Sequence, residues 1–149
     1  MTDRSILILG AGTMQIPALL AAKKIGLIRY VVDGNPHALG RDECDAFQVI
    51  DLKEKETILE YAREIPNLSA VFTAGTDFSA SVAYVAEALG LPGIGHEVAL
   101  DASIKGRMRS RFAQAGVPSP AYALLEGEKD LPRQIENALA TVTLPAVVK

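Results

Sequence analysis

Short apolar segments alternate along this chain with longer segments whose apolar residues recur at helical spacing, and this alternation constrains the fold most. Ser5–Leu9 reads SILIL, an apolar run typical of a parallel strand that is buried on both faces. A helical pattern follows from Ile16 to Ile25, and Gly26 stands where a helix C-terminal glycine belongs. Strand followed by helix at this spacing predicts a parallel sheet with helices on both faces.

The alternation continues to residue 95. We expect a second helix that Asp51 opens, with Glu54 three residues later in a capping-box arrangement, and a third helix that Gly90 closes. Further strands are expected at Ile28–Val32, which ends at Asp33, and at Ala46–Ile50, Ala70–Thr73 and Leu91–Ile94. The predicted fold class is therefore α/β, a Rossmann-like three-layer α/β/α arrangement whose parallel sheet has the strand order 3-2-1-4-5.

The composition changes from His96 onward, and Pro118 and Pro120 mark a joint between two units. The segments expected here are helices at Glu97–Ala102 and Ile104–Ala115, a strand at Tyr122–Leu125, a helix at Leu131–Ala140 and an apolar strand at Pro145–Val148. We divide the chain into three parts. Residues 1–95 form a Rossmann-like domain, residues 96–117 form connecting helices, and residues 118–149 begin a partial second α/β subdomain. Because an apolar strand needs covered neighbours, we expect the sequence to be a fragment of a longer protein.

Composition and charge exclude several classes of protein. Hydrophobic residues make up 49% and charged residues 22% of the 149 residues, which excludes a disordered chain. The net charge of −3 argues against a surface that coats nucleic acid. Cys44 is the single cysteine, which rules out an internal disulfide and favours a reducing compartment. Glycines, polar residues and a proline interrupt the apolar stretch from Ile6 to Ala22, so we predict a soluble, cytoplasmic protein without a membrane span.

The first candidate site is the turn GAGTMQ that follows the first strand. Gly10 and Gly12 allow the backbone to turn sharply and approach a ligand, and the next helix offers unpaired N–H groups. Asp33 lies where a dinucleotide-binding fold places the carboxylate that holds ribose hydroxyls. Gln15 breaks that fingerprint, which requires glycine or alanine at its position. The turn therefore contacts a ligand or is simply a structural turn, and both interpretations stay open.

The second candidate site is the loop AGTDFSAS, residues 74–81, after the fourth strand of the alternation. Thr76, Asp77 and Ser79 place polar groups at a strand-to-helix junction, where they can hydrogen-bond a polar substrate. The alternative is that Asp77 or Ser79 merely caps the next helix. Neither Ser79 nor Ser81 lies in a Gly-x-Ser-x-Gly elbow, which argues against a hydrolase nucleophile.

Two lysines and two histidines complete the candidates. Lys105, near the start of its predicted helix, is most simply a surface charge. Lys149 continues an apolar run and therefore needs an anionic partner, such as a phosphate, or an exit to solvent. His37 and His96 have no second ligand residue at a metal-binding spacing, so no metal site is expected.

Taken together, five segments resemble the front end of the ATP-grasp superfamily, in the carbamoyl-phosphate-synthase-like and biotin-carboxylase-like branch. The segments are ILILGAGTMQ, VVDGNPHALG, AVFTAGTDFSASVAYVAEALGLPGIG, KGRMRSRFAQAGVPSP and LPAVVK, in this order. They span nearly the whole chain, and their order and spacing carry the resemblance.

The resemblance implies a Rossmann-like pre-ATP-grasp domain that helps hold the acceptor or carboxylate substrate, followed by the truncated start of an ATP-grasp domain. It implies that Lys105 and Lys149 contact ATP, although Ile104 stands where the family often has an acidic residue. Gly10, Gly12 and Gln15 match substrate-side positions, as do Asp33 and the loop with Thr76, Asp77 and Ser79.

The resemblance further implies a full-length parent that uses ATP and Mg²⁺ to convert a carboxylate to an acyl phosphate, which an amine then attacks. In the family, the phosphate loop, the adenine hinge and the magnesium ligands come after the position of Lys149. We therefore expect this chain to be inactive alone and to require no cofactor, and we assign no catalytic residue. The expected partners are a small-molecule carboxylate, the remainder of the ATP-grasp domain and, through exposed apolar surface, a second copy in a homodimer.

Two other functions stay open. Gly10, Gly12 and Asp33 also suit an NAD(P)-dependent oxidoreductase or a nucleotide-binding Rossmann module, although Gln15 counts against it. The third possibility is a non-catalytic assembly domain that a partner chain completes. Micromolar NAD(P) binding would favour the first of these, and tight association with a partner chain would favour the second.

Overall fold

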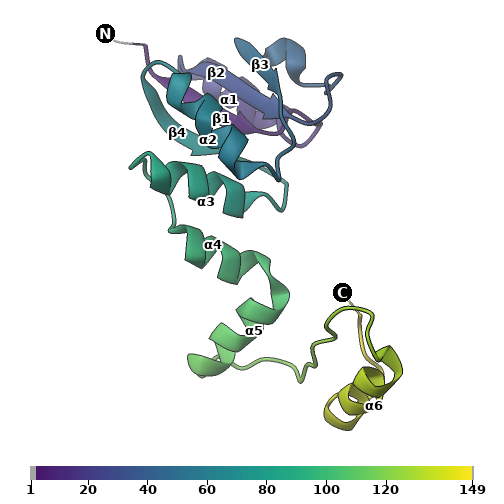
Figure 1. Ribbon diagram of the computed structural model, residues 1–149. Coiled ribbons are helices and arrows are strands. Elements are labelled where there is room, and N and C mark those ends of the chain that lie inside the picture. The colour runs from purple at the N-terminus through teal and green to yellow at the C-terminus, as the bar shows by residue number, and fades with distance from the viewer. Residues whose placement is uncertain (1–2, 149) are drawn as a thin grey trace. The chain divides into compact units, whose positions relative to one another are not determined.

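The computed structural model describes residues 3–148, which form two compact units divided between Ser103 and Ile104 (Figure 1). The first unit contains a sheet with its covering helices, and the second contains two helices with extended segments. None of the helices that the structure describes is long and apolar enough to cross a membrane.

A four-stranded parallel sheet forms the centre of the first unit. Its strands are β1 (Ser5–Leu9), β2 (Ile28–Asp33), β3 (Ala46–Val49) and β4 (Leu68–Phe72), in the order β3-β2-β1-β4. In this register Leu7 of β1 lies between Tyr30 of β2 and Val71 of β4. The α/β class, the parallel pairing and the order of these four strands are confirmed.

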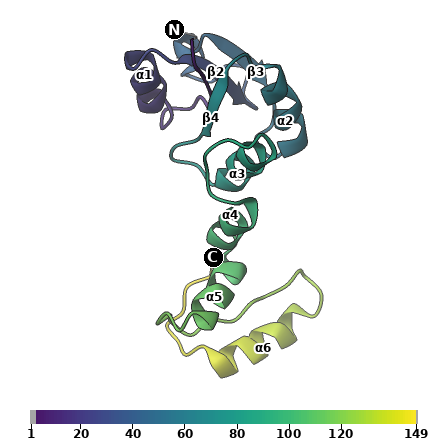
Figure 2. The same ribbon diagram turned by 90° about the vertical axis from the view of Figure 1, so that its left-hand side faces the viewer.

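Helices cover both faces of this sheet, as expected for parallel strands. Figure 2 shows α1 on one face and α2 and α3 on the other. The helices of this unit are α1 (Ile16–Lys24), the 3₁₀ turn η1 (Arg41–Glu43), α2 (Lys55–Glu64), α3 (Ser79–Ala88) and α4 (His96–Ser103). α4 packs against α3 rather than against the sheet.

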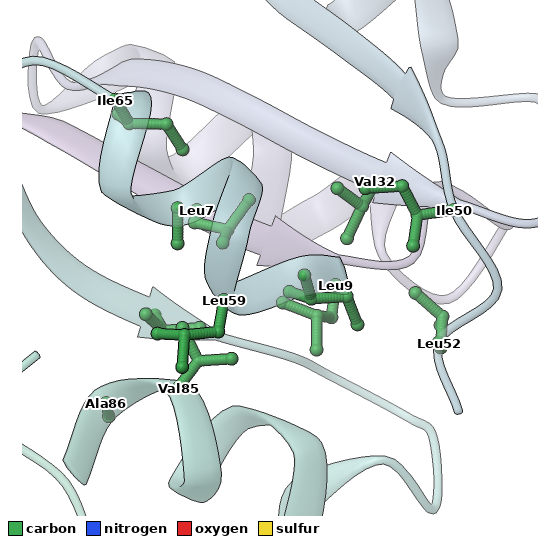
Figure 3. Packing of buried hydrophobic residues seen from close by; sticks show 12 residues of the cluster. Leu7, Leu9, Val32, Ile50, Leu52, Leu59, Ile65, Val85 and Ala86 are labelled. Atoms are coloured by element: carbon green, nitrogen blue, oxygen red, sulfur yellow. The ribbon is translucent and has the colours of Figure 1, made fainter. Parts of the chain in front are cut away.

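Alternate residues of each central strand face opposite layers of the core. On one face, Leu7 and Leu9 of β1 pack with Leu59 of α2 and Val85 of α3 (Figure 3). On the other face, a smaller cluster surrounds Ile8 of β1 beneath α1. Since a buried aliphatic side chain contributes about 1.5–3 kcal/mol, these two clusters supply the main stabilisation of the unit.

Two expectations for this unit are wrong. Leu91–Ile94 does not pair with β4, so the described sheet ends there. Pro92 has no N–H group for a sheet ladder, and the adjacent Gly93 weakens a strand further, whereas Leu91 packs on the core without pairing. α2 begins at Lys55 instead of directly after Asp51, because the Asp51 carboxylate accepts the N–H of Lys53 at 2.9 Å and forms a separate turn.

The second unit consists of α5 (Lys105–Gln114), α6 (Leu131–Thr141) and the segments around them. A Cβ atom on Gly106 would lie 3.1 Å from the Leu124 side chain, so α5 and the 118–126 segment pack closely. Gln134 of α6 joins that segment as well, since it accepts the N–H of Glu126 at 2.7 Å and donates to the Glu126 carbonyl at 3.1 Å.

The strands expected in the second unit are absent from its described residues. Tyr122–Leu125 and Pro145–Val148 have no strand assignment, and no residue between 104 and 148 is buried. A strand needs a neighbour for its backbone N–H and C=O groups, and residues 104–148 supply none. The described part of the second unit therefore has helices and extended segments without an assigned strand, and Lys149 lies outside the described residues.

An ion pair with one buried partner joins β2 to the residue before β3. The Arg29 side chain is 9% exposed, and its Nε and Nη2 atoms each donate to an Asp45 carboxylate oxygen at 2.7 Å. The Arg29 backbone N–H donates to the same carboxylate at 2.8 Å. These hydrogen bonds from Arg29 lower the pKa of the Asp45 carboxyl.

We predict that Asp45→Asn destabilises the fold at neutral pH by about 1–2 kcal/mol, a value reduced by the 41% exposure of the Asp45 side chain. Because the folded-state pKa of Asp45 is lowered, the stability that its charge supplies is present above the unfolded pKa of about 3.9 and is lost as the pH falls through the folded value. Urea unfolding from pH 7 down to pH 3 measures the difference in unfolding free energy between wild type and Asp45→Asn. This difference should become smaller below a pH of about 4.

The matched control is Asp42→Asn, which removes the same charge from an exposed residue of η1. A difference between wild type and Asp45→Asn that stays constant across this pH range would contradict the prediction.

Candidate functional site

The carboxyl ends of β1 and β4 lie side by side and form the point from which the chain leaves the sheet in two directions. The connection after β1 leads through α1 on one face, and the connection after β4 leads into α3 on the other (Figure 2). In open parallel sheets, ligands bind at this kind of switch point, just beyond the strand ends. Both loops selected from the sequence, residues 10–15 and 74–81, meet here.

The turn after β1 and the loop after β4 are held together by direct contacts. The buried side chain of Gln15 donates a hydrogen bond from Nε2 to the carbonyl of Ala74. Gly75 has a φ of +63°, and a Cβ atom there would lie 2.9 Å from Cβ of Met14. Glycine is therefore required at position 75 both for its backbone conformation and for the close approach of Met14.

Thr73 ties the end of β4 to the end of β1. Its Oγ1 atom donates to the carbonyl of Leu9 at 2.7 Å and lies 3.1 Å from Oγ1 of Thr76. Thr76 in turn accepts the N–H of Phe78 at 3.1 Å, which shapes the turn that leads into α3. Thr76 thus lies at the junction of the two loops, half-buried, with its hydroxyl already engaged in shaping the loop.

Asp33 lies at the end of β2, as the sequence predicts, and organises the neighbouring backbone. Its Oδ2 atom accepts the N–H of Ala11 at 2.7 Å, and its Oδ1 atom accepts the N–H of Asn35 at 2.8 Å. The carbonyl of Ala11 accepts the N–H of Gly40 at 2.7 Å. The carboxylate therefore fixes the glycine turn and the loop after β2, and each oxygen keeps one further lone pair for a ligand hydroxyl or amine.

The polar residues after β4 have different surroundings. Asp77 is exposed, whereas the hydroxyl of Ser79 lies 3.0 Å from the hydroxyl of Ser103 on α4. α3 follows Phe78 and has no side-chain cap, so neither Asp77 nor Ser79 caps it. The buried hydroxyl of Ser81 donates to the carbonyl of Leu52 at 2.8 Å and joins α3 to the segment before α2.

The remaining candidates have other surroundings or lie outside the described residues. His96 contacts Tyr84 edge-on at 5.2 Å between ring centroids, and its Nδ1 atom lies 3.0 Å from the carbonyl of Ala80, so it packs α4 on α3. Lys105 is the exposed first residue of α5 in the second unit. Among residues 3–148, no group of three or more His, Cys, Asp or Glu side chains is arranged to hold a metal ion.

Sequence reasoning missed Met14, Thr73 and Gly75. Gly75 carries a readable signal, since a glycine among small polar residues after a buried strand predicts a tight turn. The contact between Met14 and Gly75 had no such signal, because it joins residues whose proximity depends on the pairing of β1 with β4.

Comparison with solved structures identifies the fold. The chain matches phosphoribosylglycinamide synthetase from Anaerococcus prevotii with a TM-score of 0.74 and 24% identity, over 91% of this chain and 35% of that one. The chain has the fold of the N-terminal third of ATP-grasp enzymes.

Two further structures show the same likeness. L-amino acid ligase from Bacillus licheniformis matches with a TM-score of 0.63 and 21% identity, over 85% of this chain and 35% of that one. N5-carboxyaminoimidazole synthetase from Staphylococcus aureus, complexed with ADP, matches with a TM-score of 0.69 and 14% identity, over 89% of this chain and 35% of that one. No protein-family model and no curated protein matches the sequence.

The chain therefore spans about a third of the length of the solved structures it matches. The Rossmann-like sheet, its strand order and its α/β/α layers belong to this ATP-grasp N-terminal fold.

We predict that Gly75→Ala costs about 2–3 kcal/mol of folding free energy, because it combines an unfavourable positive φ with a clash against Met14. Gly90→Ala is the matched control, since Gly90 has a φ of +64° with no atom within 4 Å of an added Cβ. It should cost about 1 kcal/mol. If both variants lost the same unfolding free energy in urea, a clash of the added Cβ at position 75 with Met14 would be ruled out.

Proposed function

We propose that this chain forms the substrate-side part of an ATP-dependent carboxylate ligase. The observation that carries the proposal is the likeness of 91% of the chain to about a third of a ligase-type enzyme, with both candidate loops at the switch point of that fold. The reaction class is formation of an acyl phosphate from a carboxylate and ATP, followed by attack of an amine or ammonia on the acyl phosphate.

The exposed rim of the loop pair is the part of this chain that would contact the substrate. Asp77 carries an exposed negative charge in the loop between β4 and α3, and Asp33 keeps free lone pairs at the end of β2. Carboxylates at these positions suit the amino or hydroxyl groups of a small polar substrate. Gly12 and Thr76 would contribute backbone contacts, while Gln15 joins the two loops and Ser79 contacts Ser103 of α4.

ATP and Mg²⁺ would be held mainly by residues other than the described residues 3–148. The described residues supply no group of acidic side chains that fits a magnesium ion, so no step of this chain is assigned to the metal. Lys105 and Lys149 are proposed as the ATP contacts, on the basis of the sequence resemblance. The phosphate loop, the adenine hinge and the magnesium ligands would come from additional polypeptide, and the chain alone would require no cofactor.

The second unit supports completion by additional polypeptide. None of its described residues, 104–148, is buried, and α6 carries an apolar stripe along one side. Its exposed large hydrophobic residues include Leu124, Leu125, Leu131, Ile135, Leu139, Leu144, Val147 and Val148. Apolar surface on this scale favours association. The same observation supports the second candidate function, a non-catalytic assembly domain that a partner chain completes.

Trapping acyl phosphates with hydroxylamine tests the ligase proposal. The chain alone, given ATP, Mg²⁺ and a panel of carboxylates and amino acids, should form no hydroxamate. The protein completed by the remaining ATP-grasp region should form hydroxamate and release ADP with at least one carboxylate of the panel. Acyl phosphate formation by the chain alone, or none by the completed protein, would contradict the proposal.

We further predict that Asp77→Asn in the completed protein raises the KM of the amine or carboxylate by about tenfold, because it removes a charged contact worth ~1.4 kcal/mol. Since Asp77 is exposed, the fold should be unaffected. Asp42→Asn, an exposed acid on η1, is the control and should leave KM unchanged. Identical kinetics of the two variants would remove Asp77 from the substrate site.

A further inference from the structure

We propose that Gln15 is a built-in occupant of the glycine turn after β1 and the residue that excludes a dinucleotide pyrophosphate from it. The turn otherwise carries the dinucleotide fingerprint, with Gly10 and Gly12 in place and Asp33 at the end of β2. Only its third glycine position is different, and Gln15 occupies it. The inference does not depend on the proposed ligase activity.

The side chain of Gln15 lies in the space that the two glycines leave open. A Cβ atom on Gly10 would lie 3.2 Å from Cγ and Cδ of Gln15, and one on Gly12 would lie 3.1 Å from its Oε1. In a dinucleotide-binding turn, the missing side chain of the second glycine allows the backbone to approach the pyrophosphate. In this chain the same gap receives the amide of Gln15.

Burial and hydrogen bonding hold the Gln15 side chain in this position. Gln15 is only 4% exposed, and its Nε2 atom donates to the carbonyl of Ala74 in the loop after β4. A phosphate that entered the turn would have to displace this amide and break the link between the two loops. Loss of a buried hydrogen bond without replacement opposes such entry.

The charge next to the turn acts in the same direction. The Asp33 carboxylate accepts the N–H of Ala11 at 2.7 Å, so one of the backbone donors of the turn already holds an anion. Ribose hydroxyls can still bind the remaining lone pairs of Asp33, but a pyrophosphate must also find room beside Gly12. Because the ribose-binding acid is present as Asp33, it is steric occupation by Gln15 that closes the turn to NAD(P).

Titration with ADP-ribose tests the inference, because this probe carries the pyrophosphate and both riboses without redox chemistry. Gln15→Gly converts GAGTMQ into GAGTMG, the complete fingerprint, and Gln15→Ala provides the other small residue that the fingerprint accepts. By calorimetry, both variants should bind ADP-ribose at least about tenfold more tightly than wild type. Gln15→Met is the matched control, since it fills the space without the amide and should exclude the probe like wild type.

Wild-type protein provides a second readout if the small variants do not fold. In NMR spectra, the side-chain amide of Gln15 and the backbone amides of Gly12 and Thr13 should not shift when ADP-ribose or inorganic pyrophosphate is added. Shifts that saturate would overturn the inference. So would folded Gln15→Gly and Gln15→Ala variants that bind ADP-ribose no better than Gln15→Met.

The result is distinguishable from a failure of the ligase proposal. Binding of ADP-ribose to these variants involves neither a carboxylate substrate nor the second unit. A completed protein that forms no acyl phosphate would leave the ADP-ribose result unchanged.

Discussion

The arrangement of this site depends on the hydrogen bond between Gln15 and Ala74, which joins residues 59 positions apart in the chain. It holds the turn after β1 against the loop after β4, and Gly75 allows Met14 to lie directly on that loop. Thr73 adds a bond to Leu9 at the strand ends. The two loops are therefore one structural element, and a ligand at the switch point would meet their shared rim rather than either loop alone.

These contacts between the two loops change the functional interpretation of the glycine turn. Glycines after a first strand usually indicate a ligand that approaches the backbone closely. Here Gly10 and Gly12 make room for Gln15, and Asp33 holds the N–H of Ala11. The residues that favour an NAD(P)-binding module in the sequence thus contact other parts of the turn in the structure, which explains their presence without a bound dinucleotide. That mutual arrangement counts against an NAD(P)-binding turn at this position.

The two units of the chain differ in how completely their apolar residues are covered. In the first unit, β1 is flanked by β2 and β4, and Leu7 and Ile8 are fully buried on opposite faces. In the second unit, Leu144, Val147 and Val148 are exposed, and the described residues around them form no sheet. The hydrophobic pattern of Pro145–Val148 suits a strand, but a strand exists only where a neighbour accepts its backbone hydrogen bonds.

Hydrophobic periodicity and glycine placement act locally, and the handedness of parallel crossovers restricts the topology. The amino-acid sequence alone therefore predicts the α/β class, the order of the first four strands and the location of Asp33. It could not determine the role of Gln15, which read only as a departure from the dinucleotide fingerprint. Nor could it exclude the strands at Leu91–Ile94 and Pro145–Val148, whose local patterns are apolar. These points became visible only in the folded chain, since side-chain placement and strand pairing depend on residues that are distant in the sequence.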